Sequence, residues 1–395
     1  MIPFSKQSIS RKDIDYVVKV LKSDFLTQGP NTIKFEKKIS QYTNSKYTIS
    51  SNSGSSSLHL ACLALGLSKN EIVWTVPNTF AASANCALNC GAKIDFVDID
   101  KETWNIDIKL LKNKLIESRK KRILPKILIP VHFAGQPADQ KEIWKLSKEF
   151  NFKIIEDASH SLGSKHHGEK TGSCKWSSIT VFSFYPTKII TTGEGGAATT
   201  NDKNLAEKMK MYRTNGITKN SSLFSKKNKN SPWYYEHQTI GFNYRMNELS
   251  AALGLSQLSR INKFTKERNR IANKYKKIFK NMPVKFQKIE EYNYSSYHLM
   301  VVKFDLNKFK YTYKKIFNKL RAKGFYVNLH YMPLHLSPYF KKNGFKKKDF
   351  PVSENFSSMS VSIPIYYGLQ NKKFINYIKL FKILSNDKKI NFWHS

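Results

Sequence analysis

The sequence predicts an α/β fold, with a large domain built on a mainly parallel mixed sheet and a smaller C-terminal α+β domain. From about residue 46 to residue 200, short β-branched or apolar runs alternate with amphipathic stretches, which is the pattern of βαβ units. A long helical pattern follows, and beyond Met282-Pro283 the chain mixes strand-like and helix-like segments. We therefore expect a large domain over residues 1–262 and a smaller one over 263–395.

The predicted sheet is built from short runs rich in Val, Ile, Thr and aromatic residues. These runs are Tyr47–Ser51, Glu71–Val76, Lys93–Asp98, Ile127–His132, Lys153–Asp157, Ser178–Phe184 and Ala197–Thr200. Helices are predicted between several of them, over Ser55–Leu65, Phe80–Asn89 and Asp139–Phe150. Parallel strands joined by helices are covered on both faces. Because the ligand crevice of such a sheet lies beyond the carboxyl ends of its strands, chemistry is expected there.

The long helical segment Asn247–Phe279, in which apolar residues recur every three or four positions, leads into the C-terminal part. This periodicity predicts a helix that connects the two domains. The smaller domain is then predicted to hold strands over Ser296–Phe304 and Tyr326–Leu329 and helices over Lys314–Lys323 and Lys372–Leu384.

Composition excludes several classes of protein. The chain has 395 residues, of which 40% are hydrophobic and 13% aromatic, so it is not intrinsically disordered. No apolar run approaches the ~20 residues that span a bilayer, and the N-terminus lacks the features of a signal peptide. The four cysteines show no Cys-x-x-Cys spacing, so neither a disulfide framework nor a metal site is expected. We expect a soluble, cytoplasmic protein without a membrane partner.

The chain is strongly basic, with 67 Lys+Arg against 29 Asp+Glu and a net charge of +38. Such a charge attracts anions, and nucleic acid is the first partner that it suggests. The positive residues are spread over the chain, however, and no zinc-finger spacing, RNP signature or helix-turn-helix accompanies them. A solvated surface is therefore favoured over a nucleic-acid site. A nucleotide-sugar diphosphate would also be attracted by this field.

The first candidate segment for chemistry is Ser51-Asn-Ser-Gly-Ser-Ser-Ser57, which leads from a predicted strand into a predicted helix. A helix start has free N–H groups and a partial positive charge, and together with hydroxyl groups it forms a phosphate cradle. An ordinary serine N-cap is the alternative interpretation.

Two further strand ends contain an acid and an amine. Asp157 ends an apolar strand, where a carboxylate can keep a neighbouring ring nitrogen protonated or simply cap the next helix. Lys188 follows a strand, beside Pro186 and before a Gly-rich turn. This setting partly desolvates the amine and lowers its pKa, as Schiff-base chemistry requires, although most lysines are surface residues. A phosphate cradle, a carboxylate and a desolvated lysine are together what a pyridoxal phosphate (PLP) site requires.

The chain resembles the sugar aminotransferases of the DegT/DnrJ/EryC1/StrS family nearly from end to end. The motifs that carry the resemblance are LKSDFLTQGP at 21–30, SGSSSLHLACLALGL at 53–67, PNTFAASAN at 77–85, VDIDKETWNID at 97–107, PVHFAGQPAD at 130–139, EDASHSLGS at 156–164, FSFYPTKIITTGEGG at 182–196, IGFNYRMNELSAALGLSQL at 240–258 and HYMPLH at 330–335. The resemblance implies the aspartate-aminotransferase-like fold (fold type I), PLP as cofactor and a homodimer with shared sites.

The resemblance also implies roles for single residues. Lys188 would be the Schiff-base lysine and Asp157 the partner of the pyridine nitrogen. The other implied cofactor contacts are Phe80 stacked on the ring, His160 near the 3′-oxygen, Ser55, Ser183 and the backbone around Ser56 at the phosphate, and Asn243 at the phosphate of the neighbouring subunit's cofactor. Ser55 stands where Thr is usual, which keeps the hydroxyl. For the substrate, we expect basic residues together with His330 and Tyr331 to hold the diphosphate.

The motifs LTQGP, PNTFAASAN and TKIITTGEGG are most similar to family members that act in pseudaminic acid synthesis. The resemblance therefore implies a PLP-dependent aminotransferase that aminates C4 of a 4-keto-6-deoxy sugar, a UDP-linked N-acetylhexosamine derivative, with glutamate as donor. Relatives that are sugar dehydratases carry His in place of Lys188, so the lysine favours transamination. The alternatives are amination of another 3- or 4-keto nucleotide sugar, linked to GDP or dTDP, for O-antigen, capsule or antibiotic sugars, and a nucleic-acid-binding regulator on the same scaffold.

Overall fold

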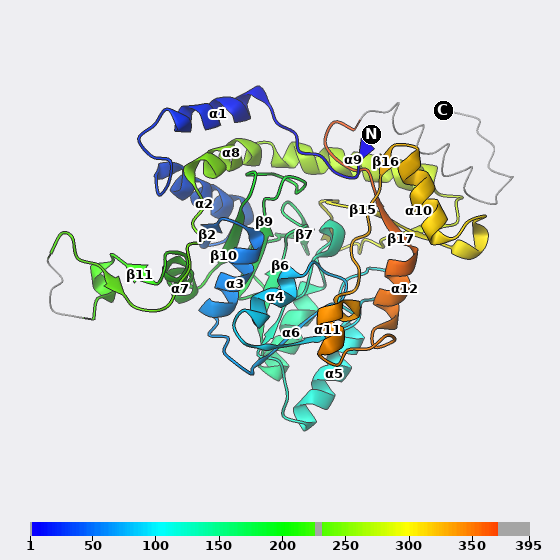
Figure 1. Cartoon of the computed structure of the whole chain (residues 1–395), viewed down its shortest axis with the longest axis horizontal. Coiled ribbons are helices and arrows are strands. Elements are labelled where there is room, and N and C mark those ends of the chain that lie inside the picture. Colours follow the sequence, from blue (N-terminus) through cyan, green and yellow to red (C-terminus); the bar gives the residue numbers. More distant parts are fainter. Residues whose placement is uncertain (1, 226–230, 370–395) are drawn as a thin grey trace.

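The computed structural model describes residues 2–225 and 231–369, and a seven-stranded sheet lies at its centre (Figure 1). The strand order is β2-β10-β9-β6-β5-β3-β4. The strands are β2 (Tyr47–Ser51), β3 (Ile72–Thr75), β4 (Lys93–Phe96), β5 (Ile127–Leu128), β6 (Lys153–Asp157), β9 (Ile179–Ser183) and β10 (Gly196–Thr200). Every pairing is parallel except those of β10, which is antiparallel to both neighbours. The predicted mainly parallel sheet is confirmed.

Side chains along the strands alternate between two covered faces, as the period of a strand requires. Val73, Ile155 and Val181 lie in the core on one face, which is covered by α3 (Gly54–Ala64), α4 (Ala82–Leu88) and α7 (Lys203–Arg213). Trp74 and Ile154 lie in the core on the other face. That face is covered by α5 (Ile108–Lys120) and α6 (Gln140–Phe150), and nearer β9 and β10 by α2 (Pro30–Thr43) and α8 (Glu248–Leu258).

Two predicted elements are shorter than expected. The run Ile127–His132 forms a strand only over its first two residues, because Pro130 has no N–H to donate to a ladder. The predicted helix Asn247–Phe279 is two helices, α8 and α9 (Ile261–Ile278). The chain leaves helical geometry at Arg260, whose φ is −109° and ψ 3°, and the Arg260 guanidinium reaches back to the Ser8 carbonyl and the Asp13 carboxylate.

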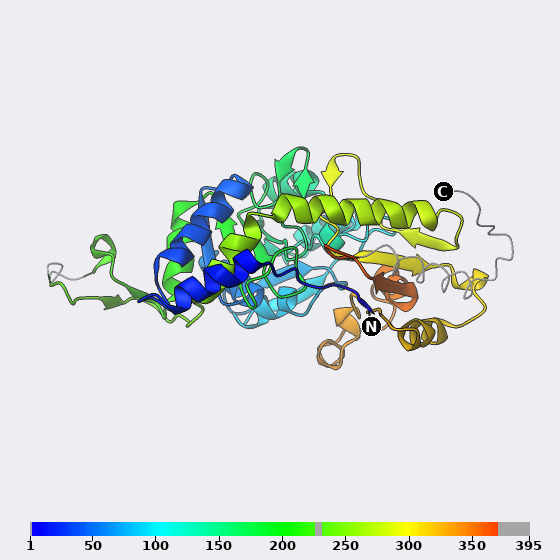
Figure 2. The same cartoon turned by 90° about the horizontal axis from the view of Figure 1, so that it is seen from above.

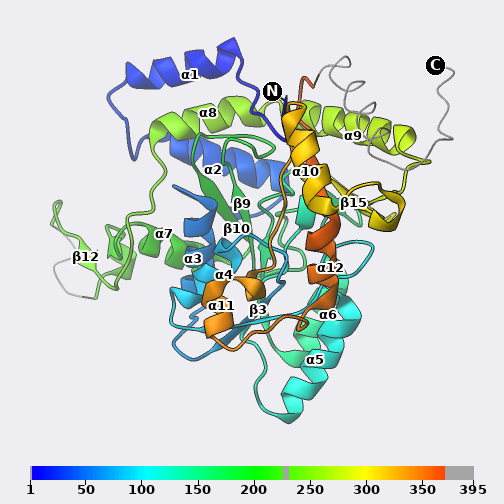
Figure 3. The same cartoon turned by 45° about the vertical axis from the view of Figure 1, so that its right-hand side comes forward.

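The C-terminal part has its own antiparallel sheet, in the order β13-β15-β17. It consists of β13 (Val284–Phe286), β15 (Met300–Phe304) and β17 (Ser360–Ile363), and it shares a core with α9 and α10 (Tyr313–Ala322). Two more helices, α11 (Pro338–Lys342) and α12 (Pro351–Met359), return the chain to the large sheet. Figure 3 shows α10 and α12 on the side of the molecule that carries this second sheet. The division at residue 262 stays a prediction, and the predicted helix Lys372–Leu384 lies outside the described residues.

The N-terminal segment runs across the molecule from the C-terminal part to α1 (Arg11–Leu21) and α2 (Figure 2). Its first strand, β1 (Ile2–Pro3), pairs with β16 (Phe325–Tyr326) of the C-terminal part, and α1 follows and lies along α8. A small three-stranded sheet joins β7 (Lys165–His166) to β8 (Glu169–Lys170) and β14 (Asn293–Tyr294). The strands β11 (Ile217–Thr218) and β12 (Glu236–His237) form an arm that extends away from the body (Figures 1 and 2).

Candidate active site

A cavity of about 750 Å³ lies at the carboxyl ends of the central strands, where the sheet topology predicts a ligand site. Its walls come from the starts of α3 and α4, from the ends of β6 and β9, and from the segment that follows β16. The predicted site residues that line it are Ser55, Phe80, Asp157, His160, Ser183, Lys188, His330 and Tyr331. Residues far apart in the sequence therefore meet in one place.

Lys188 lies in the turn after β9, and its amine is both desolvated and close to an acid. Burial lowers the pKa of Lys188 to about 8, and the nearby Asp157 carboxylate partly opposes this shift. The backbone N–H of Lys188 donates to the Tyr185 carbonyl at 2.9 Å, which fixes the turn. The amine is thus partly neutral near pH 8, as a nucleophile or base must be.

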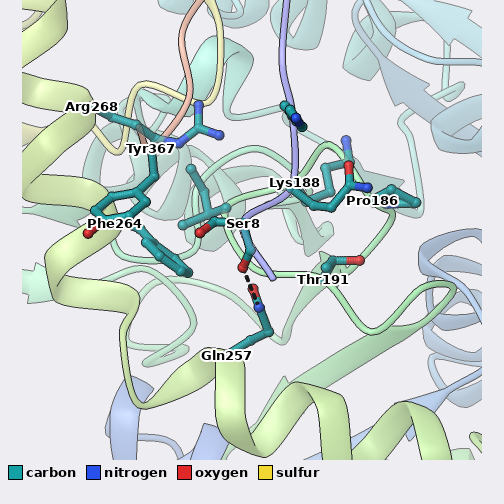
Figure 4. A pocket seen from close by; sticks show the side chains of 11 residues that line it. Ser8, Pro186, Lys188, Thr191, Gln257, Phe264, Arg268 and Tyr367 are labelled. Carbon is teal, nitrogen blue, oxygen red and sulfur yellow. Dashed lines mark hydrogen bonds between the residues drawn. The ribbon is translucent and has the colours of Figure 1, made fainter. Parts of the chain in front are cut away.

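The N-terminal segment holds the turn that carries Lys188. The Ser5 hydroxyl donates to the carbonyl of Thr187 at 3.0 Å. The same segment is fixed at Ser8, whose carbonyl accepts from Gln257 Nε2 at 2.9 Å (Figure 4). Figure 4 also shows Pro186, Lys188 and Thr191 across from Phe264, Arg268 and Tyr367, on the walls of a narrow crevice. Sequence reasoning missed Ser5, because nothing in the sequence relates it to a lysine more than 180 positions away.

Asp157 ends β6 and is almost fully buried, with 5% of its surface exposed. One carboxylate oxygen accepts from the Ser83 hydroxyl at 2.6 Å, and the other accepts from the Ser159 N–H at 3.1 Å. Ser83 also lies 2.8 Å from the Thr79 hydroxyl. These bonds fix the carboxylate at the cavity wall, where it can hold a cationic ring nitrogen. Ser83 and Thr79 were not predicted, since a serine inside a helix gives no functional signal.

His160 is held as one neutral tautomer. The Ala134 N–H donates to His160 Nδ1 at 3.3 Å, so the proton of a neutral ring is on Nε2, which lies 3.0 Å from the Tyr331 hydroxyl. Burial lowers the pKa of His160 well below its ordinary value, and Lys188 and His330 add to the effect. Burial likewise raises the pKa of Tyr331. His160 therefore donates to the Tyr331 oxygen, which leaves the phenol proton free to face the cavity.

His330 and a histidine that was not predicted, His298, complete this wall. His330 Nδ1 lies 2.7 Å from the Ser362 hydroxyl, and burial, with a smaller effect of Lys188, lowers the pKa of His330 to about 3. The His298 ring lies 4.4 Å from that of His160. Burial also lowers the pKa of His298 well below its ordinary value. All three rings are therefore uncharged near neutral pH, which makes this wall of the cavity polar but not cationic.

The cavity wall also carries a second aromatic ring, Phe80, 6.2 Å from the Tyr331 ring, and the start of α3. Phe80 is 60% exposed although it lines the cavity, so its ring is open to a ligand. Ser53 caps α3 by accepting from the Ser56 N–H at 3.1 Å, and a Cβ on Gly54 would lie 2.8 Å from Ser183 Cβ. Only glycine allows this close approach of β9 to the helix start. As a result, Ser55 and Ser183, which carry the hydroxyls of the predicted phosphate site, line the same cavity.

Two predicted contacts do not line this cavity. The Ser56 N–H is bonded to Ser53, and its hydroxyl donates to Asn52 at 2.6 Å. Asn243 is exposed, beside Asn52, whose side chain donates to the Asn243 carbonyl at 3.4 Å. Both roles stay predictions. The other lining residues that sequence reasoning did not find include Phe4, Tyr185, Glu194 and Asn328, which come from loops and from the N-terminal segment.

Two absences can be stated for the part of the chain that the structure describes. Within residues 2–225 and 231–369, no helix has the length and apolar character needed to cross a membrane. In the same residues, no cluster of His, Cys, Asp and Glu is arranged to hold a metal ion.

Comparisons with known proteins agree on one family. The model of the DegT/DnrJ/EryC1/StrS aminotransferase family matches residues 7–381. The UDP-4-amino-4,6-dideoxy-N-acetyl-β-L-altrosamine transaminase of Campylobacter jejuni is 37% identical over 392 residues, which cover 98% of this chain and 99% of the relative.

Solved structures of sugar aminotransferases have the same fold as this chain. PseC of Helicobacter pylori, an aminotransferase of pseudaminic acid biosynthesis, superposes with a TM-score of 0.86 and 30% identity, over 97% of this chain and 98% of its own. The PLP form of the putative sugar aminotransferase Spr1654 from Streptococcus pneumoniae gives 0.85 and 26%, with the same coverage of each chain.

Proposed function

This chain belongs to the DegT/DnrJ/EryC1/StrS aminotransferase family, and we propose that it transfers an amino group from glutamate to C4 of a 4-keto-6-deoxy sugar. The sugar is a UDP-linked N-acetylhexosamine derivative, as in pseudaminic acid biosynthesis. The observation that carries the choice of substrate is the full-length similarity to a transaminase of such a UDP-sugar. The four cysteines are free, and we place the reaction in the cytoplasm.

The protein is a nucleotide-sugar aminotransferase, and its cofactor is pyridoxal 5′-phosphate. The cavity fits this group by the chemistry of its donors. It offers a desolvated amine at Lys188, a buried carboxylate at Asp157, and an open aromatic face at Phe80. Ser55 and Ser183, at a helix start, suit the phosphate. When bound, PLP would supply an aldehyde that can carry an amino group between donor and ketosugar and an electron-withdrawing ring that stabilises negative charge on the reacting carbon.

The residues of this chain then have distinct tasks. Lys188 Nζ, at its lowered pKa, takes a proton from the donor carbon and returns one on the acceptor side. Asp157 keeps the ring nitrogen protonated, and its bonds to Ser83 and Ser159 hold it in place. The open phenol of Tyr331 is a donor for the substrate, together with His330. Glutamate and the sugar use the same cavity in turn.

The desolvated amine predicts a pH dependence for cofactor uptake. An amine with a pKa of about 8 is mostly protonated below that pH and mostly neutral above it, and only the neutral form attacks an aldehyde. The rate at which the apoprotein takes up PLP covalently is therefore expected to rise through pH 8 and then level off. Stopped-flow absorbance of the apoprotein mixed with PLP measures it. A midpoint near 10.5, the ordinary value for lysine, would show that the amine is not desolvated.

The proposed substrate is tested with a panel of sugars. The protein, loaded with PLP and given ¹⁵N-glutamate, is incubated with 4-keto and 3-keto sugars linked to UDP, GDP or dTDP. Mass spectrometry and NMR of the products are expected to show ¹⁵N at C4 of the UDP-linked 4-keto-6-deoxy sugar, at the highest kcat/KM of the panel. A higher kcat/KM for a GDP- or dTDP-linked sugar, or for a 3-keto sugar, would identify the alternative substrate. Unlabelled product would exclude glutamate as the donor.

The working unit is proposed to be a homodimer with shared sites. The arm around β11 and β12 exposes large apolar side chains, among them Trp233 with 80% of its surface accessible, and such side chains are usually covered by a partner. Asn243 lies at the base of this arm, beside the start of α3. The fit of Asn243 to a neighbour's phosphate rests on the family resemblance.

Shared sites predict complementation between two inactive variants. Lys188→Ala and Asn243→Ala dimers are each expected to have little activity. In a mixed dimer, one site carries both changes and the other carries neither, so random reassortment of equal amounts is expected to restore about a quarter of the wild-type activity. The measurement is kcat after mild dissociation and reassembly, with each variant alone as control. If both residues serve the same subunit's site, mixing restores nothing.

A further inference from the structure

The first residues of the chain form a strap, residues 2–8, whose beginning is held by the C-terminal part (Figure 2). The Ile2 N–H donates to the Gly324 carbonyl at 2.7 Å. The Ile365 N–H donates to the Phe4 carbonyl at 2.9 Å. Because both bonds are between backbone groups, the strap holds its course at Phe4 whatever side chain stands there.

The rest of the strap is held by α8 and by the turn after β9. The Ser8 carbonyl accepts from Gln257 Nε2 at 2.9 Å. Between the two ends, Ser5 is buried, and its hydroxyl donates to the Thr187 carbonyl at 3.0 Å. Thr187 immediately precedes Lys188, so this bond ties the strap to the turn that carries the amine.

Two hollow spaces are bordered by Lys188, and the strap borders both of them. Phe4 lines the active-site cavity. Lys6, Gln7 and Ser8 line the narrow crevice (Figure 4). Lys188 is a lining residue of the cavity and of the crevice. The strap therefore runs beside Lys188, and without it water would reach this residue from both spaces.

Phe4 is the strap residue that faces the cavity, and its side chain is fixed by packing. The ring is partly buried and packs against the core cluster that contains Trp74 and Ile154. It also lies 5.0 Å from the His330 ring, with the two planes at 60°. An apolar ring excludes water from the space that it fills. Phe4 thus closes part of the wall of the cavity in which Lys188 lies.

We propose that Phe4 and Ser5 are positioning residues for the reaction: Ser5 fixes the turn that carries Lys188, and Phe4 keeps water away from the amine. Neither residue has to touch the reacting atoms. Burial disfavours the charged form of an amine, and the pKa of Lys188 is lowered by burial accordingly. This inference rests on the proposed role of Lys188 as the lysine that binds PLP.

The test measures the protonation of Lys188 without PLP or substrate. The full-length apoprotein is labelled with a trace of acetic anhydride over a range of pH, and its peptides are quantified by mass spectrometry, because only a neutral amine is acetylated. In the wild type, the midpoint for Lys188 is expected near pH 8. Phe4→Ala admits water, so its midpoint is expected to rise to about 9 or above, towards the ordinary 10.5. Ser5→Ala releases the turn and is expected to move the midpoint in the same direction.

The same change is expected in the uptake of the cofactor. A rise of about one pH unit in the midpoint lowers the neutral fraction of the amine near pH 7 about tenfold. Covalent uptake of PLP at that pH is therefore expected to slow by the same factor in Phe4→Ala, and to recover when the pH is raised. A variant that only folds badly would be slow at every pH.

Three further variants separate the two roles from a loss of folding. Phe4→Leu keeps an apolar side chain and Ser5→Thr keeps the hydroxyl, so both are expected to have midpoints close to that of the wild type. Ser8→Ala is the matched control for Ser5→Ala. It makes the same substitution three positions further along the strap, where the bond to Gln257 uses the carbonyl, and it is expected to leave the midpoint unchanged.

Unmoved midpoints in folded Phe4→Ala and Ser5→Ala proteins would overturn the proposal. So would a rise in Ser8→Ala as large as that in Ser5→Ala, or a wild-type midpoint already near 10.5, the ordinary value for lysine. A failure of the proposed role of Lys188 gives a different result. Borohydride reduction of the wild-type protein with PLP would then place the covalent link on another lysine, whatever the midpoints of the variants.

Discussion

Lys188→Ala is expected to lower kcat by about 10³-fold or more, which is the range that a well-positioned acid–base group contributes. Lys188 is the only amine that lines the cavity among the described residues, so no neighbour can replace it as nucleophile and proton carrier. The variant is also expected to lose the covalent link to PLP. Borohydride reduction followed by peptide mass measurement detects that link at residue 188 in the wild-type protein.

Three controls separate chemistry from folding in this variant. Lys175→Ala removes an exposed lysine that pairs with Glu169 at 2.6 Å, and it is expected to keep activity within about twofold, as surface pairs contribute little. Lys188→Arg keeps the charge but cannot donate a neutral amine, so it is expected to be as inactive as the alanine variant. Added methylamine is expected to restore part of the alanine variant's activity. A Lys188→Ala protein with normal kcat and a PLP-linked peptide elsewhere would refute the assignment.

The strand ends explain why much of this cavity could be predicted from the sequence. Asp157 and Lys188 each follow a short apolar run, and the carboxyl ends of parallel strands meet at the same edge of a sheet. Asp157 and Lys188 could therefore be predicted to lie close together although they are distant in the sequence. The direction of β10 was not predictable in the same way, because an antiparallel strand inside a parallel sheet has no distinct pattern of side chains.

The rest of the cavity depends on tertiary packing. His330 and Tyr331 come from a loop of the C-terminal part, and only the family resemblance pointed to them. Their position is set by contacts such as the Tyr331 N–H to Asn78 Oδ1, at 2.9 Å. Ser5 and Ser83 act through other residues, on the Thr187 carbonyl and the Asp157 carboxylate. A single serine hydroxyl that bonds to a residue distant in the sequence cannot be recognised from its sequence neighbours.

Asp157→Asn is expected to lower kcat by about 10- to 10³-fold. An adjacent carboxylate shifts the pKa of a cation by about 1–3 units in favour of the charged form. The amide removes that charge while keeping one oxygen for the Ser159 N–H, and its NH2 group can donate to the Ser83 hydroxyl. Asp157→Glu keeps the charge but displaces it from both bonds, so its kcat is expected to lie between those of the wild type and the amide. Ser83→Ala is expected to lose less, about 10-fold, since it removes one hydrogen bond to a charged group.

The effect of Asp157→Asn can also be measured on the pKa of Lys188, independently of kcat. The Asp157 carboxylate raises the pKa of Lys188 against the effect of burial. Without the negative charge the ammonium form is less stable, so the pKa of Lys188 falls, and the midpoint for covalent uptake of PLP by the apoprotein is expected to move below pH 8. The same stopped-flow titration measures this shift. A variant that merely folds badly would take up PLP slowly at every pH without moving the midpoint. A lower kcat with an unmoved midpoint would therefore mean that the carboxylate does not lie against the amine as the cavity places it.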